Sequence, residues 1–380
     1  FVPWRDSAGA ALAPSASLCL MARCFTSCEE PEHLIEDLTD ESGGGAIPRA
    51  PETKGLPLRP LAVPEEISLG GNLLALRVDG EGRMRAQSPS RLDKLLVSPL
   101  AWLLNELGIA ASIWAPEALD VLTAGSLFHR LAEELFPAGA PLPLEKDIET
   151  RLPDLMKAAV EELAPFLLAA PWMVERRRLQ AEFTAALISW RRTLASLGAE
   201  ILANELPLSG EALGIPCRGT IDSLLRLPDG ELVIVDHKTS GAGVRRKRME
   251  QGWDLQVEIY RLLAGQAKGN PDLETKGLVP GPDIAVAYHT TRDGTLLFHG
   301  AAPPRTAPGV EVIDADIGAA ALARLPSELS ALEAGRLELP AWTTLDRMAK
   351  GGVKPYALDD SPLVAAFVRA PDAEDGSDDA

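Results

Sequence analysis

The chain has few cysteines, no long apolar run and a deficit of positive charge. Four cysteines among 380 residues cannot form the disulfide framework of a small secreted domain. No apolar run approaches the roughly 20 residues that a helix needs to cross a membrane. Pro and Ser interrupt the apolar stretch at 8–21, and Arg5 is the only cation before it, which argues against a secretory signal. We therefore expect a cytoplasmic protein without membrane contact.

The net charge of −18 does not indicate broad, nonspecific binding to nucleic acid. Any nucleic acid would need local basic patches, or a partner that supplies the positive charge. The chain also lacks the G-x4-G-K-[ST] phosphate loop, and it is therefore not its own ATP-driven motor. Three cysteines near the start, Cys19, Cys24 and Cys28, have no fourth ligand nearby. Reduced thiols are a simpler interpretation of them than a metal site.

Hydrophobic residues make up 46% of the chain, which is enough for a sizeable core. Residues 1–85 are rich in Pro, Gly and acidic residues, as in a linker or the tail of a missing upstream domain. Because the chain starts with Phe, we expect a fragment or a processed product. A short strand is expected at 72–78. One folded domain is predicted over 86–340, followed by an extension over 341–380 with an acidic, disordered tail.

The folded domain has helical periodicity in its first half and strand periodicity in its second half. Ser88 or Ser90 is a candidate cap for the first helix, and Pro89 fits its first turn. Helices are expected at 88–104, 124–136, 148–168 and 172–197. A strand is expected at 199–208, followed by a hairpin at 219–239 and a loop at 240–248. A helix at 253–263, a second hairpin at 283–299 and a closing helix at 315–337 complete the domain. This order predicts an α/β fold with a mixed central β-sheet flanked by helices.

The stretch from Gly219 to Thr239 predicts a β-hairpin. Two runs rich in Ile, Leu and Val flank Pro228-Asp229-Gly230, where Pro presets one turn angle and Gly accepts a positive φ. A three-residue loop makes Leu227 and Glu231 the flanking pair. The second strand, 231–235, is apolar on both faces, so it should be central in the sheet.

This register places Asp222 directly opposite Asp236. Opposed side chains share one face of a strand pair, and two carboxylates there repel each other. Lys238 lies two residues beyond Asp236 and shares that face. A divalent cation bound between the acids would offset the repulsion, and hard oxygen ligands suit Mg²⁺ or Mn²⁺. The alternative is an ordinary hairpin with a surface ion pair.

The order of Gly219, Asp222, an apolar run, Asp236 and Lys238-Thr239 resembles the PD-(D/E)XK nuclease superfamily. Three further segments resemble its RecB/AddB-type exonuclease branch, namely Ser-Pro-Ser-Arg-Leu at 88–92, Gly-Ser-Leu-Phe-His at 125–129 and Gln-Val-Glu-Ile-Tyr at 256–260. Each segment alone is a weak signal, but their order is specific. The resemblance covers roughly residues 86–300.

The resemblance implies a restriction-endonuclease-like nuclease domain over 86–340 with a helical N-terminal part. It implies a Mg²⁺- or Mn²⁺-dependent DNA exonuclease that acts in double-strand-break repair or recombination, beside a helicase subunit or an upstream helicase domain. The metal ligands carried over are His129, Asp222, Asp236 and the backbone carbonyl of His237. The catalytic residues carried over are Asp222, Asp236, Lys238, Gln256 and Tyr260, of which the last two share one helix face.

Several roles stay open on the sequence. His129 is either a metal ligand or a surface or core histidine of its helix, and Tyr260 either faces the site or packs in the core. Glu205 either lines the site as an extra acid or faces solvent. The basic run Arg245–Arg248 either contacts phosphates beside the site or forms a solvated loop.

The resemblance is incomplete in one respect. Many relatives in this branch carry a four-cysteine iron–sulfur cluster, but its first cysteine would fall near Ser98, and the C-terminal part has no cysteine. We therefore expect no such cluster. The main alternative function is a catalytically silent nuclease-fold subunit that binds DNA or acts as a scaffold in a helicase–nuclease complex. A hydrolase of small phosphate esters is a third hypothesis.

Overall fold

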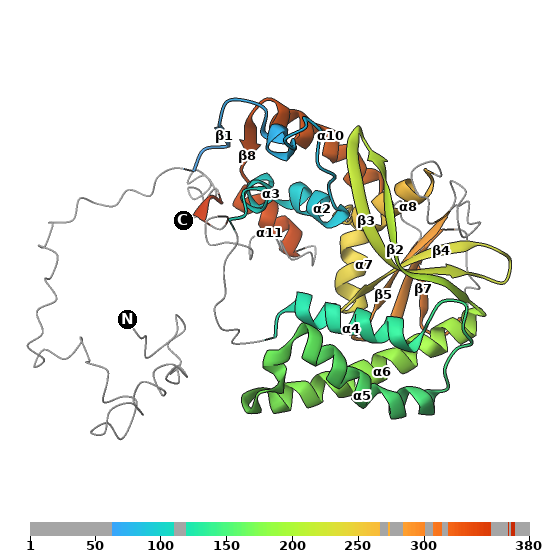
Figure 1. Ribbon diagram of the computed structural model, residues 1–380. Helices are drawn as coiled ribbons and strands as arrows, with labels where there is room; N and C mark the ends of the chain where they lie inside the picture. Colours follow the sequence, from blue (N-terminus) through green and yellow to red (C-terminus); the bar gives the residue numbers. More distant parts are fainter. Residues whose placement is uncertain are drawn as a thin grey trace, which may run out of the picture. The chain divides into compact units, whose positions relative to one another are not determined.

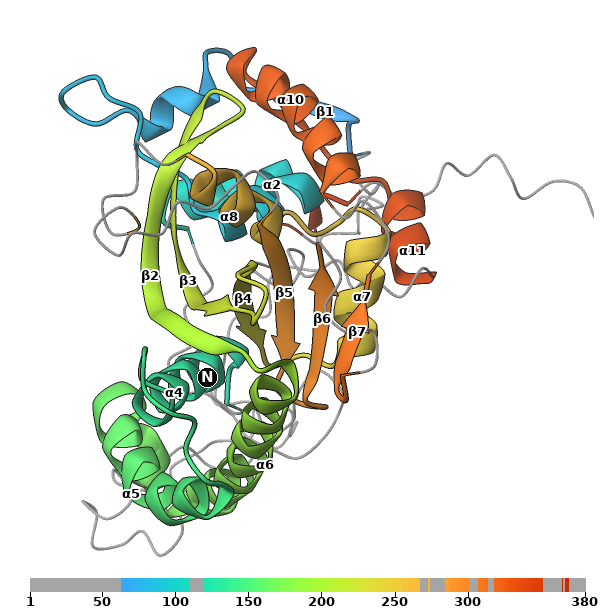
Figure 2. The ribbon, with the colours of Figure 1, turned by 90° about the vertical axis from the view of Figure 1, so that its right-hand side faces the viewer.

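The second half of the chain forms a six-stranded sheet with the strand order β2-β3-β4-β5-β6-β7 (Figures 1 and 2). These strands span Glu200–Ala212, Ile215–Arg226, Leu232–Lys238, Ala285–Thr290, Thr295–His299 and Val310–Val312. The β4–β5 and β6–β7 pairs are parallel, and the other pairs are antiparallel. The predicted α/β fold with a mixed central sheet is thus confirmed, and β4 lies inside the sheet as expected.

The computed structural model describes residues 63–109, 119–266, 273, 284–300, 307–313, 318–350, 364 and 366–368. The three N-terminal cysteines, most of the predicted linker and the acidic tail lie outside these residues. The division into a linker over 1–85, a folded domain over 86–340 and an extension over 341–380 stays a prediction. None of the helices in the described part of the chain is both long and apolar enough to cross a membrane.

The hairpin between β3 and β4 has the predicted register. Leu227 N donates to Glu231 O across the turn at 2.8 Å, and the ladder runs from the pair Arg226–Leu232 to the pair Ser223–Val235. One more step along this register places Asp222 opposite Asp236. The backbone ladder ends at the pair Ser223–Val235. Beyond it, the Asp222 side chain links the two strands, because its Oδ2 accepts a hydrogen bond from His237 N at 2.5 Å.

Helices cover both faces of the sheet (Figure 2). One face packs on α2 (Pro89–Val97), α8 (Gln256–Ala264) and α10 (Ala319–Glu333), with Ile234 and Tyr288 among the sheet residues of this core. The other face packs on α4 (Val121–Leu135), α5 (Glu145–Leu163) and α6 (Met173–Leu197), through sheet residues such as Val235 and Ala287. Because side chains alternate along a strand, neighbours on β4 belong to different cores.

Two helices differ from the sequence prediction because of local chemistry. The helix expected from Ser88 to Leu104 is divided at Ser98, which ends α2 and caps α3 (Pro99–Glu106) by accepting a hydrogen bond from Ala101 N at 3.2 Å. Pro99 has no N–H to continue the first helix. Ser88 caps α2 as predicted, with Pro89 in the first turn. The loop expected at 240–248 is wrong, because α7 (Ala242–Glu250) occupies it.

The strand expected at 72–78 is also wrong. Asn72 accepts a hydrogen bond from Leu74 N at 2.8 Å and caps a 3-10 helix, η2 (Leu73–Arg77). The closing helix α10 is shorter than expected, since β8 (Arg336–Glu338) follows it and pairs with β1 (Glu66–Ser68). The remaining elements named here are the 3-10 turns η3 and η4 (Pro165–Leu168 and Ala170–Trp172) and α11 (Trp342–Lys350).

Candidate metal centre and active site

Three side chains with metal-ligand chemistry meet over β2 and β3. His129 of α4, Glu205 of β2 and Asp222 of β3 each place one ligand atom within 4.8 Å of the other two. His129 Nδ1 lies 3.4 Å from Asp222 Oδ1 and 3.5 Å from Glu205 Oε1. Within the described residues, this is the one group of three or more such side chains that meets this spacing.

The burial of α4 positions His129. Asp120 caps the helix by accepting a hydrogen bond from the backbone of its first turn at 2.8 Å. Leu127 and Phe128 then bury the apolar stripe in the helical layer. His129 stands at the edge of this stripe, and its side chain keeps 29% of its exposure. The helix therefore fixes the imidazole without enclosing it.

A backbone irregularity positions Glu205. Its φ is +47°, a left-handed conformation that costs a non-glycine residue about 1 kcal/mol or more. The neighbouring ladder pair, Leu206 with Ile221, sets a register that places Glu205 opposite Asp222. Of the two interpretations left open by the sequence, the structure supports an acid beside the site, although the side chain remains 38% exposed.

Asp236 lies next to this group but has different partners. Lys238 Nζ is 2.6 Å from Asp236 Oδ2, and Gln256 Nε2 donates to Asp236 Oδ1 at 2.9 Å. The same Gln256 nitrogen lies 3.3 Å from the Tyr260 hydroxyl. The structure thus brings together the four residues that the resemblance assigned to the site from β4 and α8. Their catalytic roles stay a prediction.

Gly219, the first residue of the motif on β3, permits the close approach of α8. A Cβ atom at this position would lie 2.6 Å from the ring of Tyr260 and 3.0 Å from the ring of Pro89. A side chain would therefore push Tyr260 away from Gln256 and Asp236. The motif glycine is explained by packing around the site, and Tyr260 serves both the core and the site, since it is 5% exposed.

The carboxylates of Glu205, Asp222 and Asp236, here called the carboxylate cluster, are electrostatically strained. Burial, reinforced by the charge of Asp236, raises the pKa of Asp222 to about 8. Burial alone would lower the pKa of His129, but the hydrogen bond with Glu205 and the charges of Asp222 and Asp236 outweigh it and raise that pKa to about 9. The shift of Asp222 reflects burial first and the charge of Asp236 second, and the shift of His129 reflects the negative charge of the three acids around it.

The donor set fits a divalent cation. Two ligands that bind one ion at about 2.1 Å lie at most about 4.2 Å apart. The contacts of His129 with Asp222 and Glu205 are shorter than this, and the ligand atoms of Glu205 and Asp222 lie within 4.8 Å of each other, so that a small side-chain adjustment brings all three onto one ion. Carboxylate oxygens favour Mg²⁺ and Mn²⁺, and an imidazole is compatible with a transition metal. A cation at this position would also offset the burial of Asp222 and its repulsion by Asp236, which together raise the pKa of Asp222.

The His237 side chain faces the opposite core. Its Nδ1 lies 2.9 Å from Nδ1 of His289 on β5, and Phe128 and Trp190 pack against its ring. Burial, with smaller effects of neighbouring cations, lowers the pKa of His237, and burial lowers the pKa of His289 to about 3. Both rings are therefore neutral, and one Nδ1–H donates to the other Nδ1. Metal binding by the His237 carbonyl stays a prediction.

The three arginines of the basic run Arg245–Arg248 form ion pairs with acidic side chains of the protein. Arg245 is buried and lies 2.6 Å from Asp254 Oδ2, and Arg248 lies 3.5 Å from Asp93 Oδ2. Arg246 pairs with Glu311 at the surface. The interpretation of this run as a solvated loop is therefore wrong, and phosphate contact by Arg245 is excluded by its burial.

We call Asp93, Asp254, Arg245 and Arg248, together with Tyr288, the buried ion network. Tyr288 donates to Asp254 Oδ1 at 2.5 Å, and its ring lies 5.8 Å from Lys238 Nζ. Tyr288 therefore joins the network to Lys238 through a cation–π contact. No local motif marks Asp254 or Tyr288, because they meet only through the tertiary packing of α7, α8 and β5.

The comparisons with known proteins agree with this geometry. The family model of the PD-(D/E)XK nuclease superfamily matches residues 86–350, which is well over half of the chain. No curated protein matches the chain at a significant level. The matched region contains the hairpin with Asp222, Asp236 and Lys238, the histidine of α4 and the Gln/Tyr face of α8. The chain belongs to the PD-(D/E)XK nuclease superfamily.

Proposed function

We propose that the chain is a divalent-metal-dependent DNA exonuclease that uses Mg²⁺ or Mn²⁺. The observation that carries this proposal is the meeting of two arrangements. The first is the group of His129, Glu205 and Asp222, whose ligand atoms fit one cation. The second is the ion pair of Asp236 and Lys238 beside it. Family membership supports the reaction class, and the metal, the DNA substrate and the exonuclease mode are additions of the proposal.

In this proposal, Asp222, Asp236, His129 and the His237 carbonyl hold the metal. Glu205 joins them, because its Oε1 is about as close to His129 Nδ1 as the Asp222 oxygen is. A bound divalent metal offsets charge on the phosphorane-like transition state and lowers the pKa of the attacking water.

Lys238 then orients or deprotonates the water, or stabilises the negative charge that develops. Its Nζ is held between Asp236 Oδ2, at 2.6 Å, and the ring of Tyr288. Gln256 fixes the second oxygen of Asp236 by donating to it. Each of these contacts limits the rotamers of the reacting groups, which is what positioning contributes to a rate.

We further propose that the chain works beside a helicase in double-strand-break repair or recombination. Two observations support this: the sequence has no phosphate loop of its own, and its net charge of −18 disfavours unaided capture of duplex DNA. A motor protein that unwinds the duplex and delivers a strand end would supply both the ATP-driven unwinding and the capture of DNA that the chain lacks.

The test uses the purified full chain with end-labelled and circular DNA, single- and double-stranded, in Mg²⁺, Mn²⁺ or chelator. We expect metal-dependent release of nucleotides from linear DNA only, and loss of this release in Lys238→Ala. Lys157→Ala is the matched control, since this lysine is 71% exposed on α5, and it should behave as wild type. Absence of metal-dependent cleavage by the wild type, alone or with its motor, would overturn the proposal.

The same experiment distinguishes the silent-subunit alternative. A scaffold that binds DNA without turnover has no need of a formed metal site. Calorimetric titration with Mn²⁺ should therefore show saturable binding in the wild type and none in Asp222→Ala. DNA binding without Mn²⁺ binding or cleavage would favour the scaffold, and cleavage that mononucleotides inhibit but DNA does not would favour a small phosphate ester as substrate.

A further inference from the structure

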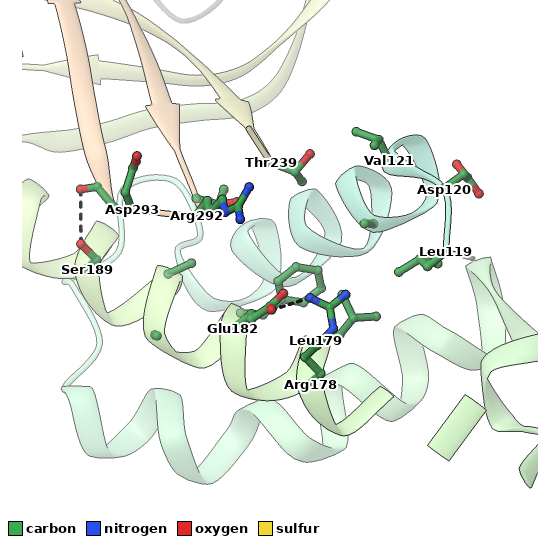
Figure 3. Close-up of a pocket in the computed structure, with 16 residues that line it drawn as sticks. Leu119, Asp120, Val121, Arg178, Leu179, Glu182, Ser189, Thr239, Arg292 and Asp293 are labelled. Atoms are coloured by element: carbon green, nitrogen blue, oxygen red, sulfur yellow. Dashed lines mark hydrogen bonds and ion pairs between the residues drawn. The ribbon is translucent and has the colours of Figure 1, made fainter. Parts of the chain in front are cut away.

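A cavity of about 700 Å³ lies between the first turn of α4, helix α6 and the turn that joins β5 to β6 (Figure 3). Its volume is within the range of about 300–1,000 Å³ that is usual for sites of small ligands. Apolar side chains, including Val121, Leu179 and Phe183, form part of its wall. None of the residues of the carboxylate cluster lines it, so it is a separate space.

The cavity shares two elements with the candidate metal centre. Ala124 lines the cavity, and His129 lies five residues further along α4, which is about 7.5 Å at the rise of an α-helix. Thr239, another lining residue, directly follows Lys238. The rise along α4 from Ala124 to His129 equals about two nucleotide steps of 3.4 Å in a stacked strand, which places this wall of the cavity near the nucleotides that flank the scissile phosphate.

The charged residues of the wall leave one free cation. Arg178 pairs with Glu182, as Figure 3 shows. Asp120 caps α4, and Asp293 accepts hydrogen bonds from the start of α7 at 2.7 Å and from a threonine hydroxyl at 2.5 Å. Arg292 is exposed at the tip of the turn, and no described residue forms an ion pair or hydrogen bond with it. It is therefore available to an anionic ligand.

We propose that this cavity binds the single nucleic-acid strand about two nucleotides from the scissile phosphate, with Arg292 on a backbone phosphate. A guanidinium matches a phosphate with two parallel hydrogen bonds, and the apolar wall suits the sugar and base. A base can enter the cavity only when it is unpaired, which makes the ligand a single strand. The inference rests on the nuclease function proposed above and adds to it a binding subsite and the form of the substrate.

The first test measures the affinity for a single-stranded oligonucleotide as a function of salt. Arg292→Ala should weaken binding about tenfold, as expected for the loss of one charged hydrogen bond. The slope of log K against log salt should decrease by about 0.7, the value for one phosphate contact on a single strand. Arg292→Lys should retain the slope. Arg177→Ala is the control, because this arginine is exposed on α6 and lies outside the cavity.

The second test locates the phosphate. Oligonucleotides with one uncharged methylphosphonate linkage, moved stepwise along the strand, should show one position about two steps from the cut where KM rises as in Arg292→Ala. In Arg292→Ala the same linkage should have no further effect, because the two changes remove one interaction.

The outcomes separate this inference from the proposed function. If the wild type cleaves and Lys238→Ala does not, but Arg292→Ala and Arg177→Ala are indistinguishable in affinity and slope, the subsite is wrong and the nuclease function stands. If additive effects of the linkage and of Arg292→Ala are found, the contact is also wrong. If no cleavage occurs in the wild type, the proposed function itself fails.

Discussion

Two sets of ionisable side chains lie on the same face of the central sheet, and they differ in charge balance. In the buried ion network, the two carboxylates of Asp93 and Asp254 face the two guanidiniums of Arg245 and Arg248. In the carboxylate cluster, three acids share one lysine and one histidine. The first set is complete without a ligand, and the second is not.

The pKa of Asp254 reflects this difference. In the network, burial alone would raise this pKa, but the charges of Arg245 and Arg248 outweigh burial and lower it. Burial and the charge of Asp254 raise the pKa of Asp93 to about 7, so the network shares one strongly stabilised carboxylate between the two guanidiniums. In the cluster, the charges of His129 and Lys238 do not outweigh burial and the charge of Asp236, and the pKa of Asp222 rises to about 8. Since buried charges in proteins are paired or bind metals, an unbalanced set on a sheet face points to a ligand, whereas a balanced set points to structure.

The largest effect should come from Asp236→Asn, which leaves the shape of the cluster and removes one of its charges. Cleavage should fall by about 10²–10⁴-fold, the usual contribution of a general base, because Lys238 loses the carboxylate that holds its Nζ. The unfolding free energy should stay constant or rise, since a repulsive charge is gone. Single-turnover cleavage and urea unfolding measure the two quantities. A fall in stability with retained cleavage would show that Asp236 belongs to the structural set.

Asp254→Asn should have the opposite effect on stability. The change leaves the Arg245 guanidinium buried without its charge partner, which costs about 3–5 kcal/mol of unfolding free energy. Glu311→Gln is the matched control, because its partner Arg246 lies beside Arg245 on α7. This ion pair is at the surface and should contribute less than about 1 kcal/mol. Urea unfolding measures both. Equal losses in the two variants would contradict the assignment of the network as a buried, balanced set.

The fold and half of the site follow from short-range patterns. The turn Pro228-Asp229-Gly230 fixes the register of β3 and β4, and that register alone places Asp222 opposite Asp236. The turn of the preceding hairpin was not predictable in this way, because Leu213 adopts φ +50°, a conformation for which leucine gives no sequence signal. The outer part of β2 and β3, from 209 to 218, was therefore missed.

The rest of the site depends on packing between distant segments. Asp254 meets Tyr288 over a separation of 34 residues, and His237 meets His289 over 52, and no local periodicity encodes such contacts. The place of Glu205 depends on a backbone irregularity in β2. The basic run of α7 was misjudged as a loop because its composition is polar, whereas burial of Arg245 against Asp254 stabilises the helix.

Metal binding should stabilise the protein through the cluster only. At a Mn²⁺ concentration of about 100 Kd, the unfolding free energy should increase by about 2.7 kcal/mol, as measured by urea unfolding with and without the metal. Asp222→Asn should abolish this increase, because it removes a ligand charge. Asp254→Asn, despite its lower baseline, should retain the full increase. If Asp254→Asn also abolishes the increase, metal binding by the carboxylate cluster depends on the buried ion network, and the two sets cannot be treated as independent.

Glu205 gives the smallest effect and the sharpest contrast, because its backbone and its side chain act in opposite directions. Glu205→Gly should raise the metal-free unfolding free energy by about 1 kcal/mol, since glycine adopts φ +47° without strain. It should lower the Mn²⁺ affinity about tenfold or more, the usual consequence of losing a group that supports a metal.

Glu205→Gln keeps the backbone strain, so it should lower the Mn²⁺ affinity without the gain in stability. Calorimetry and urea unfolding measure the two quantities. If Glu205→Gly stabilises the protein and leaves metal affinity unchanged, Glu205 is a strained bystander and the metal centre consists of His129 and the two aspartates. If both variants lower the Mn²⁺ affinity, the strained backbone at Glu205 is retained because metal binding needs this carboxylate opposite Asp222. The excess of acidic side chains in the cluster is then a consequence of its metal-binding function.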